Sequence, residues 1–421
     1  MPDGSVNNRG KRHGKRQQRN PVPESALRGF KYFKVLSPIL QRLRSEKDHH
    51  NRKLYFDQYI ALFLLYFFNP IVTSLRAIQQ VSELKKVQKV LGVKRTSLGS
   101  LSEASYVFDS QLLTPIIQQL AEQAIPLETD PKLKVIEKQL VAVDGSLLPA
   151  LPKMLWALWL DDEHRAAKLH LEFDIIKSIP VRAKVTDANA NEKDYLRKSL
   201  SSGKLYVLDA GYGQYSLFED ISKAKSSFVA RLRDNAVWQT IEERPIKKTD
   251  RLAGVQRDII VRLGSPQCQD DLSSNVRVIE VYHRGSSGRP RKSRVSSKKT
   301  FRTTDSDYTL LLVTDRMDLS ADTIALIYRY RWQIELFFRW FKCILGCSHL
   351  LSLSENGVSI QVYCALIASM LITLWTGRKP TKRTFEMLCY HFMGWADDEE
   401  LFAHIEKFKQ ADNTKKNYLS V

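Results

Sequence analysis

The chain has 421 residues, of which 43% are hydrophobic, so it is globular and too long for one ordinary core; two or three domains are expected. Its formal net charge of +19 favours a polyanionic partner, either nucleic acid or an anionic membrane surface, although a solvated basic surface without a partner has the same charge. The five cysteines are an odd number, which argues against a secreted disulfide framework and for reduced thiols in the cytoplasm.

Secretion and membrane insertion are both disfavoured. The N-terminus is polar and basic and lacks the apolar segment of a signal peptide. The apolar runs at 59–68 and 362–376 are shorter than the roughly 20 residues that a bilayer-spanning helix needs. Both runs are therefore expected to be buried core helices, and the membrane-surface interpretation is weakened.

The first part of the chain is basic and then helical. Residues 1–22 are rich in Arg and Lys without apolar periodicity, which predicts a disordered arm that either lies along phosphates or only keeps the chain soluble. Residues 23–130 show helical periodicity and predict an α-helical N-terminal domain with core helices at 54–68 and 111–125. Pro115 is tolerable in the second helix only near its start.

A candidate DNA-binding segment lies within this helical part. Residues 87–108 place Gly92 between one short helix and a second, with Lys94 and Arg95 near the entry of the second. This arrangement fits a helix-turn-helix that reads DNA, and it fits an ordinary helical hairpin equally well. The N-terminal domain is therefore a candidate for binding DNA ends.

Around Pro131 the pattern changes from helical to strand-rich. Short apolar or alternating segments predict strands at 140–146, 168–174, 180–186, 204–213 and 228–233, with a helix at 192–200. Two of these strands lead to an acid with a glycine close behind it: LVAVDGS contains Asp144, and KLYVLDAGYG contains Asp209. Either acid alone could be no more than a turn residue.

The segment 235–307 does not continue this alternation of strands and helices. It predicts strands at 257–263 and 276–283, followed by a flexible basic loop at 283–302. The loop either contacts phosphates or is a solvated linker. A further strand is predicted at 308–315.

One long helix is predicted at 321–346, because this stretch lacks Pro and internal Gly and follows Ser320 as an N-cap. At about 100° per residue, four polar side chains form one narrow stripe beside a wide apolar face; they are Tyr328, Arg331, Glu335 and Lys342. The helix is therefore mostly buried, and the Glu335 carboxylate needs a partner. That partner is a salt bridge with Arg331 or Arg339, a metal ion, or an open cleft.

The remainder is helical. Residues 349–375 predict a further helix that packs on the core. Residues 377–421 predict a helical C-terminal tail that begins with a basic segment, and no function is assigned to 397–421.

The polar stripe spells Y-x2-R-x3-E-x6-K within YRYRWQIELFFRWFK, and Asp144 and Asp209 precede it. With these residues the chain resembles the DDE transposases of bacterial insertion sequences, specifically the insertion-sequence-four group with the YREK signature. The resemblance implies an α/β fold whose RNase H-like catalytic core comprises 131–234 and 308–376, interrupted by a strand-rich insertion at 235–307. In such a core the first and fourth strands are neighbours about 4.8 Å apart, which would bring the two acids together.

The resemblance also implies roles for individual side chains. The acids that catalyse DNA cleavage and strand transfer, and that hold two Mg²⁺ ions for which Mn²⁺ can substitute, would be Asp144, Asp209 and Glu335. The residues that grip phosphates beside the cut would be Tyr328, Arg331 and Lys342. Expected partners are double-stranded DNA, as transposon ends and as target, and a second copy of the chain in the synaptic complex, without a membrane. The expected location is the cytoplasm, at the nucleoid.

One position departs from the family pattern. The family usually has D-R-G-Y at the second acid, whereas Ala210 replaces that Arg here, which removes one expected DNA contact. The sequence therefore predicts a transposase that binds the terminal inverted repeats of its element and moves the element by cutting and pasting. The alternatives are a catalytically inactive DNA-binding protein derived from such an enzyme, and a metal-dependent nuclease without strand transfer.

Overall fold

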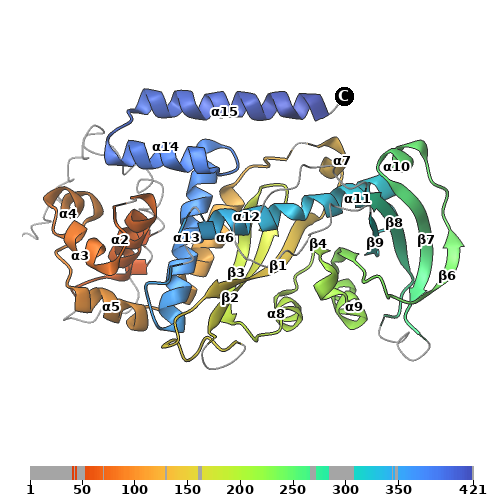
Figure 1. The fold of residues 1–421 in the computed structure, drawn as a ribbon, viewed down its shortest axis with the longest axis horizontal. Helices are drawn as coiled ribbons and strands as arrows, with labels where there is room; N and C mark the ends of the chain where they lie inside the picture. The colour runs from red at the N-terminus through yellow and green to blue at the C-terminus, as the bar shows by residue number, and fades with distance from the viewer. Residues whose placement is uncertain are drawn as a thin grey trace, which may run out of the picture.

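The computed structural model describes most of the chain (Figure 1). The described residues are 40–41, 43–44, 53–69, 71–128, 130–159, 164–265, 272–283, 308–343, 345–346 and 349–419. The basic arm predicted at 1–22 lies outside these residues, as does the basic loop predicted at 283–302 apart from its first residue.

The N-terminal part is helical, as predicted. Helix α2 (Phe56–Phe68) is apolar on nearly every side and almost wholly buried, as expected of a core helix. Three shorter helices, α3 (Leu75–Ser82), α4 (Lys85–Leu91) and α5 (Leu98–Val107), pack around it (Figure 1). Gly92 ends α4 with a left-handed φ of +64°, a conformation that strains other residues, so the chain turns here between two helices.

One predicted helix begins later than the sequence indicated. The helix expected at 111–125 is the 3-10 turn η2 (Ser110–Leu113) followed by α6 (Thr114–Gln123). Pro115 is the reason, because a residue without a backbone N–H fits the first turn of α6 but not the interior of a longer helix. A short helix, α7 (Pro131–Lys134), then leads to the sheet.

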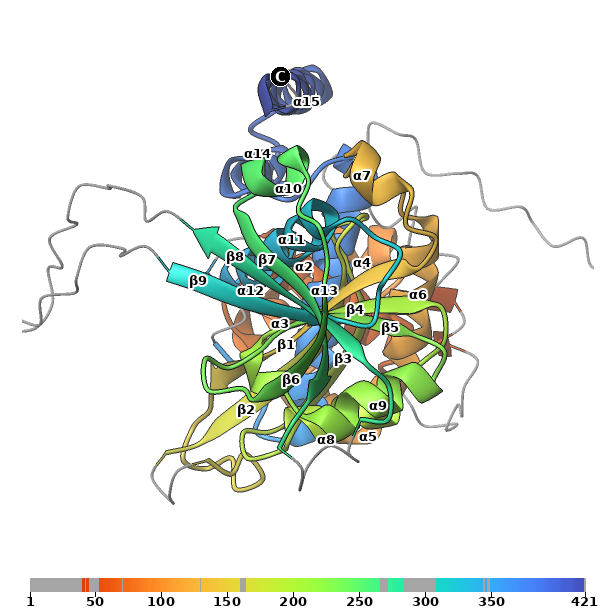
Figure 2. The same cartoon turned by 90° about the vertical axis from the view of Figure 1, so that its right-hand side faces the viewer.

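The centre of the molecule is a twisted nine-stranded sheet with the order β3-β2-β1-β4-β5-β9-β8-β7-β6 (Figure 2). Its first five strands are β1 (Gln139–Pro149), β2 (Ala166–Asp174), β3 (Ile179–Asp187), β4 (Lys204–Leu208) and β5 (Ser227–Arg231). Helix α8 (Glu192–Ser199) connects β3 to β4, and α9 (Tyr215–Lys223) connects β4 to β5. β1 pairs antiparallel with β2 and parallel with β4. The predicted α/β fold with an RNase H-like core is confirmed.

The strands of the predicted insertion extend this same sheet. β9 (Tyr308–Thr314) pairs with β5, and β8 (Val276–His283), β7 (Val255–Leu263) and β6 (Trp238–Glu243) follow in turn. β7, β8 and β9 were predicted as strands. β6 was missed because five of its six side chains are exposed, so the strand has no buried face for an apolar alternation to reveal.

Helices cover both faces of the sheet. On one face, α8 and α9 pack with inward side chains such as Val143. On the other face, α11 (Ala321–Tyr330), α12 (Trp332–Cys343) and α13 (Glu355–Thr376) pack with side chains such as Ala142. Successive residues of β1 therefore face opposite layers, as the pleat of a strand requires.

The long helix predicted at 321–346 is two helices that continue in one direction across the sheet (Figure 1). Arg331 lies between them: its N–H donates to the Tyr328 carbonyl at 3.0 Å, and its own carbonyl accepts from Ile334 at 3.1 Å. These i to i+3 bonds make a short 3-10 turn, which sequence periodicity does not reveal. Ser320 occupies the N-cap position, but its side chain makes no capping hydrogen bond.

Helix α13 is longer than its apolar run suggested. The helix has 22 residues and is long and apolar enough to cross a membrane. Nearly all of these residues are buried within the fold, which is typical of a core helix. Two further helices, α14 (Lys382–Met393) and α15 (Asp398–Leu419), lie above it (Figure 1). Arg378 ties α15 to this end of the molecule through two hydrogen bonds of 3.0 and 2.8 Å to Asp412.

Candidate active site

Two acids meet where β1 and β4 part. The parallel register of these strands ends with Ala142 paired with Val207, so Asp144 and Asp209 each lie two residues beyond the last pair. They are near enough for the charge of Asp209 to act on Asp144. β1 continues past this point to Pro149 through its pairing with β2, so Asp144 lies within its strand and not near its end as predicted. β4 ends at Leu208, directly before Asp209. Beyond this point β1 is not paired with β4.

Backbone N–H groups fix the two carboxylates. Oδ1 of Asp144 accepts a hydrogen bond from Gly145 at 2.8 Å, and Oδ1 of Asp209 accepts one from Gly211 at 2.9 Å. Asp209 thereby caps the 3-10 turn η3 (Ala210–Tyr212). This turn forms with Ala210 in place of the usual Arg, so the departure from the family pattern does not prevent the second acid from being positioned.

The electrostatic environment of Asp144 favours a cation. Burial raises the pKa of Asp144 to about 7. The Gly145 N–H and the positive charge of Arg331 oppose this shift, whereas the negative charges of Asp209 and Glu192 increase it. A buried carboxylate beside other carboxylates is stabilised in its ionised form by any cation that binds between them.

Glu335 is paired within its own motif. Nη2 of Arg331 donates to Oε1 of Glu335 at 2.6 Å, with side chains 13% and 29% exposed respectively. The guanidinium carbon of Arg331 lies 5.6 Å from the ring centre of Tyr328. Of the partners that the sequence left open for Glu335, the structure therefore shows the salt bridge with Arg331.

The remaining motif side chains approach the two Asp residues from α11 and α12. Tyr328 is 9% exposed; burial raises the pKa of its phenol, which also interacts with the charges of Arg331 and Asp209. Burial lowers the pKa of Lys342, and the negative charge of Asp144 opposes that change. Both helices therefore direct motif residues to the end of β1 and β4 at which the acids lie.

The carboxylates at this site provide some, but not all, of the ligands that a divalent cation needs. Carboxylate oxygens are ligands that Mg²⁺ prefers, and Asp144 and Asp209 present them side by side. Within the described part of the chain, however, no three His, Cys, Asp or Glu side chains are gathered closely enough to hold a metal ion. Of the three predicted acids, Asp144 and Asp209 lie near each other, and Glu335 forms an ion pair with Arg331.

A cavity of about 300 Å³ opens beside the motif, with a cationic and aromatic lining. Its charged and ring-bearing side chains are Arg231, Arg329, Arg331, His283, Tyr308, Tyr328 and Trp332. The rings of His283 and Tyr308 stack with centres 5.4 Å apart, and Trp332 is 57% exposed. Such a lining suits a ligand that carries both negative charge and flat rings.

Sequence reasoning missed most of this lining. Arg231 ends β5 and Tyr308 begins β9, and only the pairing of those two strands brings them to one place. Trp332 directly follows Arg331, so its place in the motif was a signal that could have identified it. Trp238, at the start of β6, is half-buried and packs against the sheet core.

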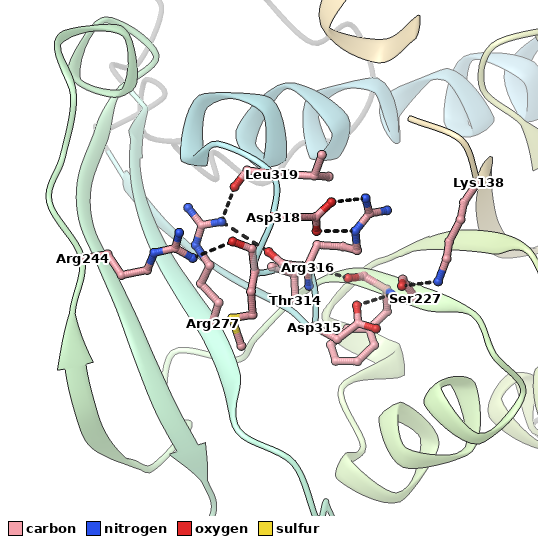
Figure 3. A network of polar contacts seen from close by, with 11 residues as sticks. Lys138, Ser227, Arg244, Arg277, Thr314, Asp315, Arg316, Asp318 and Leu319 are labelled. Atoms are coloured by element: carbon pink, nitrogen blue, oxygen red, sulfur yellow. Dashed lines mark hydrogen bonds and ion pairs between the residues drawn. The ribbon is translucent and has the colours of Figure 1, made fainter. Parts of the chain in front are cut away.

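A polar network fixes the loop that leads into α11 (Figure 3). Arg277 of β8 is 1% exposed and forms an ion pair of 2.6 Å with Asp258 of β7. Arg277 and Arg244 together donate hydrogen bonds to three carbonyl groups of the loop, those of Arg316, Met317 and Leu319. The strands of the insertion therefore hold the segment from which the motif helices start.

The first turn of α11 is also capped by the insertion. Asp250, in the short helix α10 (Lys248–Leu252), is 3% exposed. Its Oδ1 accepts the N–H of Asp322 at 3.0 Å, and its Oδ2 accepts the N–H of Lys247 at 2.9 Å. Asp250 therefore supplies the hydrogen bond that Ser320 does not provide.

Comparison with known families identifies the part of the chain that carries this site. Residues 136–371 match the family described as "Transposase DDE domain". The matched range contains both Asp residues and the whole motif on α11 and α12.

Three proteins with similar sequences are named as putative or probable transposases. A putative transposase, y4zB, of Sinorhizobium fredii is 32% identical over 212 residues, which are 50% of this chain and 53% of that protein. A probable transposase for the insertion sequence element IS5377 of Geobacillus stearothermophilus is 27% identical over 67% of each chain. A putative transposase for the element IS4SA of Synechocystis is 21% identical over 70% of this chain and 77% of its own. The match thus spans about half the length of the first relative.

One solved structure is a distant neighbour. It is the piggyBac transposase in a synaptic complex with hairpin DNA, with a TM-score of 0.39 and 10% sequence identity over 93% of this chain and 83% of that one.

Proposed function

The chain belongs to the transposase DDE domain family, and on that premise we propose that it is the transposase of an insertion sequence, which cuts DNA at the ends of its element and joins the freed ends to target DNA. The observation that carries the proposal is that Asp144 and Asp209 lie close together beyond the paired part of β1 and β4, with Arg331, between α11 and α12, near enough for its charge to act on both. A bound pair of Mg²⁺ ions would supply the positive charge that activates a hydroxyl and stabilises the leaving oxygen in phosphodiester cleavage.

Asp144 and Asp209 would form the permanent part of the metal site. Both are held by backbone hydrogen bonds, so they stay in position whether or not a metal ion is bound. Glu335 would complete the site once it leaves Arg331, since its side chain is 29% exposed and can turn. The carboxylates would then face one another with room for oxygen atoms of the DNA between them.

Binding of DNA would separate Glu335 from Arg331. A phosphate group that accepts hydrogen bonds from Arg331 competes directly with Glu335 for the same guanidinium. Tyr328, which lies against Arg331, and Lys342, near Asp144, would hold neighbouring phosphates of the transposon end. The third acid is thus released when the end is in place, and the site becomes complete only on its substrate.

Other parts of the chain would serve binding and assembly. Arg95 is exposed at the turn between α4 and α5 and, with Lys94, is a candidate contact for the terminal repeats. Synapsis of two ends requires at least two copies of the chain, so we expect a homodimer on DNA. We expect it to act in the cytoplasm, at the nucleoid.

The test uses full-length protein, labelled DNA carrying the ends of the element, a target plasmid and Mg²⁺ or Mn²⁺. The proposal predicts cleavage and joining by the unmodified chain, none by Asp209→Asn, and unchanged DNA binding by that variant. Asp194→Asn, at a side chain 57% exposed on α8, is the matched control and should retain activity. Binding without any nicking would indicate an inactive DNA-binding protein, and nicking without joining would indicate a nuclease; either result overturns the proposal.

A further inference from the structure

Glu192 lies behind the two acids and was not among the residues expected at the site. It is the first residue of α8, after Asn191, whose side chain caps the helix by accepting the N–H of Lys193 at 3.0 Å. α8 packs on the face of the sheet opposite to α12. Glu192 therefore approaches the ends of β1 and β4 from the side away from the motif.

Its first contact is with the residue after Asp144. A Cβ atom added to Gly145 would lie 2.5 Å from Oε1 of Glu192 and 2.8 Å from its carboxyl carbon. Both distances are far shorter than a van der Waals contact, so the carboxylate occupies the space that any side chain at position 145 would need. A side chain at position 145 would therefore have to displace the Glu192 carboxylate.

Its second contact is with the turn after Asp209. Tyr212 ends η3 and is 2% exposed. Burial raises the pKa of its phenol, and the negative charge of the nearby Glu192 carboxylate raises that pKa further. Glu192 is thus a neighbour of the turn that follows the second acid.

A lysine holds the carboxylate in this place. Nζ of Lys168, on β2, lies 3.4 Å from Oε1 of Glu192 and donates to the Ala190 carbonyl at 3.0 Å. The Glu192 side chain is 33% exposed, and that of Lys168 is 13% exposed. One anchored carboxylate therefore lies beside the residue after Asp144 and beside the third residue after Asp209.

We propose that Glu192 is a positioning residue of the active centre: by contacting Gly145 and Tyr212 at once, it fixes the distance between Asp144 and Asp209 and so the geometry in which they hold a metal ion. The inference rests on the proposed function, because it assigns a purpose to the Asp pair. The alternative is that Glu192 only stabilises the first turn of α8, as acids at helix N-termini commonly do.

The test measures Mn²⁺ binding to the full chain without DNA, by electron paramagnetic resonance of free Mn²⁺, alongside urea unfolding. Loss of a residue that orients metal ligands typically lowers metal affinity about 10- to 100-fold, and we expect Glu192→Ala to fall in this range. Glu192→Gln, which still offers an oxygen to Tyr212, should retain most of the affinity. Asp194→Ala, which removes another acid of the first turn of α8, is the control and should bind Mn²⁺ normally.

Two further variants test the same contact in case Glu192→Ala fails to fold. Gly145→Ala should displace the Glu192 carboxylate and lower Mn²⁺ affinity as much as Glu192→Ala does. The double variant should be no worse than either single one, because both changes remove the same contact. Additive losses, or a Glu192→Ala variant that binds Mn²⁺ like the unmodified chain, would overturn the inference while leaving the proposed function intact. Absence of Mn²⁺ binding in the unmodified chain, or binding that Asp209→Asn does not reduce, would also overturn the inference, whereas the proposed function is decided by the cleavage and joining assay.

Discussion

Arg331 donates a 2.6 Å hydrogen bond to Glu335 one helical turn further on, so the two charged groups at the centre of the motif neutralise each other in the chain without DNA. The pairing explains how an acid can be kept on a largely buried helix. Under the proposed function, Glu335 can bind a metal ion only after its hydrogen bond with Arg331 is broken. The proposed function therefore depends on a competition between a DNA phosphate and a carboxylate for one guanidinium.

Arg331→Ala should separate DNA binding from metal binding. Loss of a charge-assisted hydrogen bond to phosphate should lower affinity for end DNA by roughly tenfold or more. Mn²⁺ affinity should stay the same or rise, because Glu335 is freed. Arg339→Ala, at an exposed position of the same helix, is the control for charge alone. Fluorescence anisotropy and Mn²⁺ titration measure the two affinities, and a loss of Mn²⁺ binding in Arg331→Ala would contradict the competition.

Asp144→Asn should stabilise the metal-free protein at high pH. Burial raises the pKa of Asp144 from 3.8 to about 7, so between these values the folded chain binds a proton that the unfolded chain does not. The contribution of this group to stability is thus fully present below about pH 4 and is lost as the pH rises through about 7. At pH 8 in EDTA, Asp144→Asn should exceed the unmodified chain in free energy of unfolding by on the order of 1 to 4 kcal/mol.

The same comparison at pH 4 provides the control. There the Asp144 carboxyl is protonated in the folded chain and close to half protonated in the unfolded chain, so the variant and the unmodified chain should unfold at nearly the same urea concentration. A difference that is equal at pH 4 and pH 8 would show that the substitution acts through packing and not through ionisation.

Asp250→Ala should loosen the start of α11. The variant leaves the N–H groups of Asp322 and Lys247 without their acceptor, and loss of a helix cap costs about 0.5 to 2 kcal/mol. Asp250→Asn keeps one of the two acceptor oxygens and should recover part of that loss. Urea unfolding compares the three proteins. Equal destabilisation by Ala and Asn would mean that the charge of Asp250 matters and the cap does not.

Arg277→Met should be among the most destabilising single changes in the sheet. It leaves the Asp258 carboxylate, 4% exposed, buried without its partner, and breaking such a pair typically costs about 3 to 5 kcal/mol. Adding Asp258→Leu removes the stranded charge and should restore a large part of the stability. If the double variant is as unstable as Arg277→Met, the bonds from Arg277 to the loop before α11, and not the buried charge, dominate.

The fold and the two acids, Asp144 and Asp209, could be predicted from the sequence. The strands that carry Asp144 and Asp209 each have an apolar run before an acid, so their type and order could be predicted, and the observed parallel register then brings the acids together. The motif on α11 and α12 was recognisable because its four residues keep helical spacing. These features are local or repeat a pattern, which is why periodicity reveals them.

The features that were missed depend on contacts between distant segments. Glu192 is an ordinary first-turn acid by sequence, and only its approach to Gly145 and Tyr212 relates it to the site. The cap on α11 comes from Asp250, 72 residues earlier in the chain, although Ser320 is the natural expectation from local sequence. The break at Arg331 has a different origin: it is a local change of hydrogen bonding within a sequence whose periodicity is that of one uninterrupted helix.

The most direct test of the account is a crystal structure of the full chain with end DNA and Mn²⁺, with the metal located by its anomalous scattering. The account predicts Mn²⁺ between the carboxylates of Asp144 and Asp209, with Arg331 on a phosphate and Glu335 turned toward the metal. Mn²⁺ bound elsewhere, or Glu335 still paired with Arg331 while DNA and metal are both in place, would contradict it.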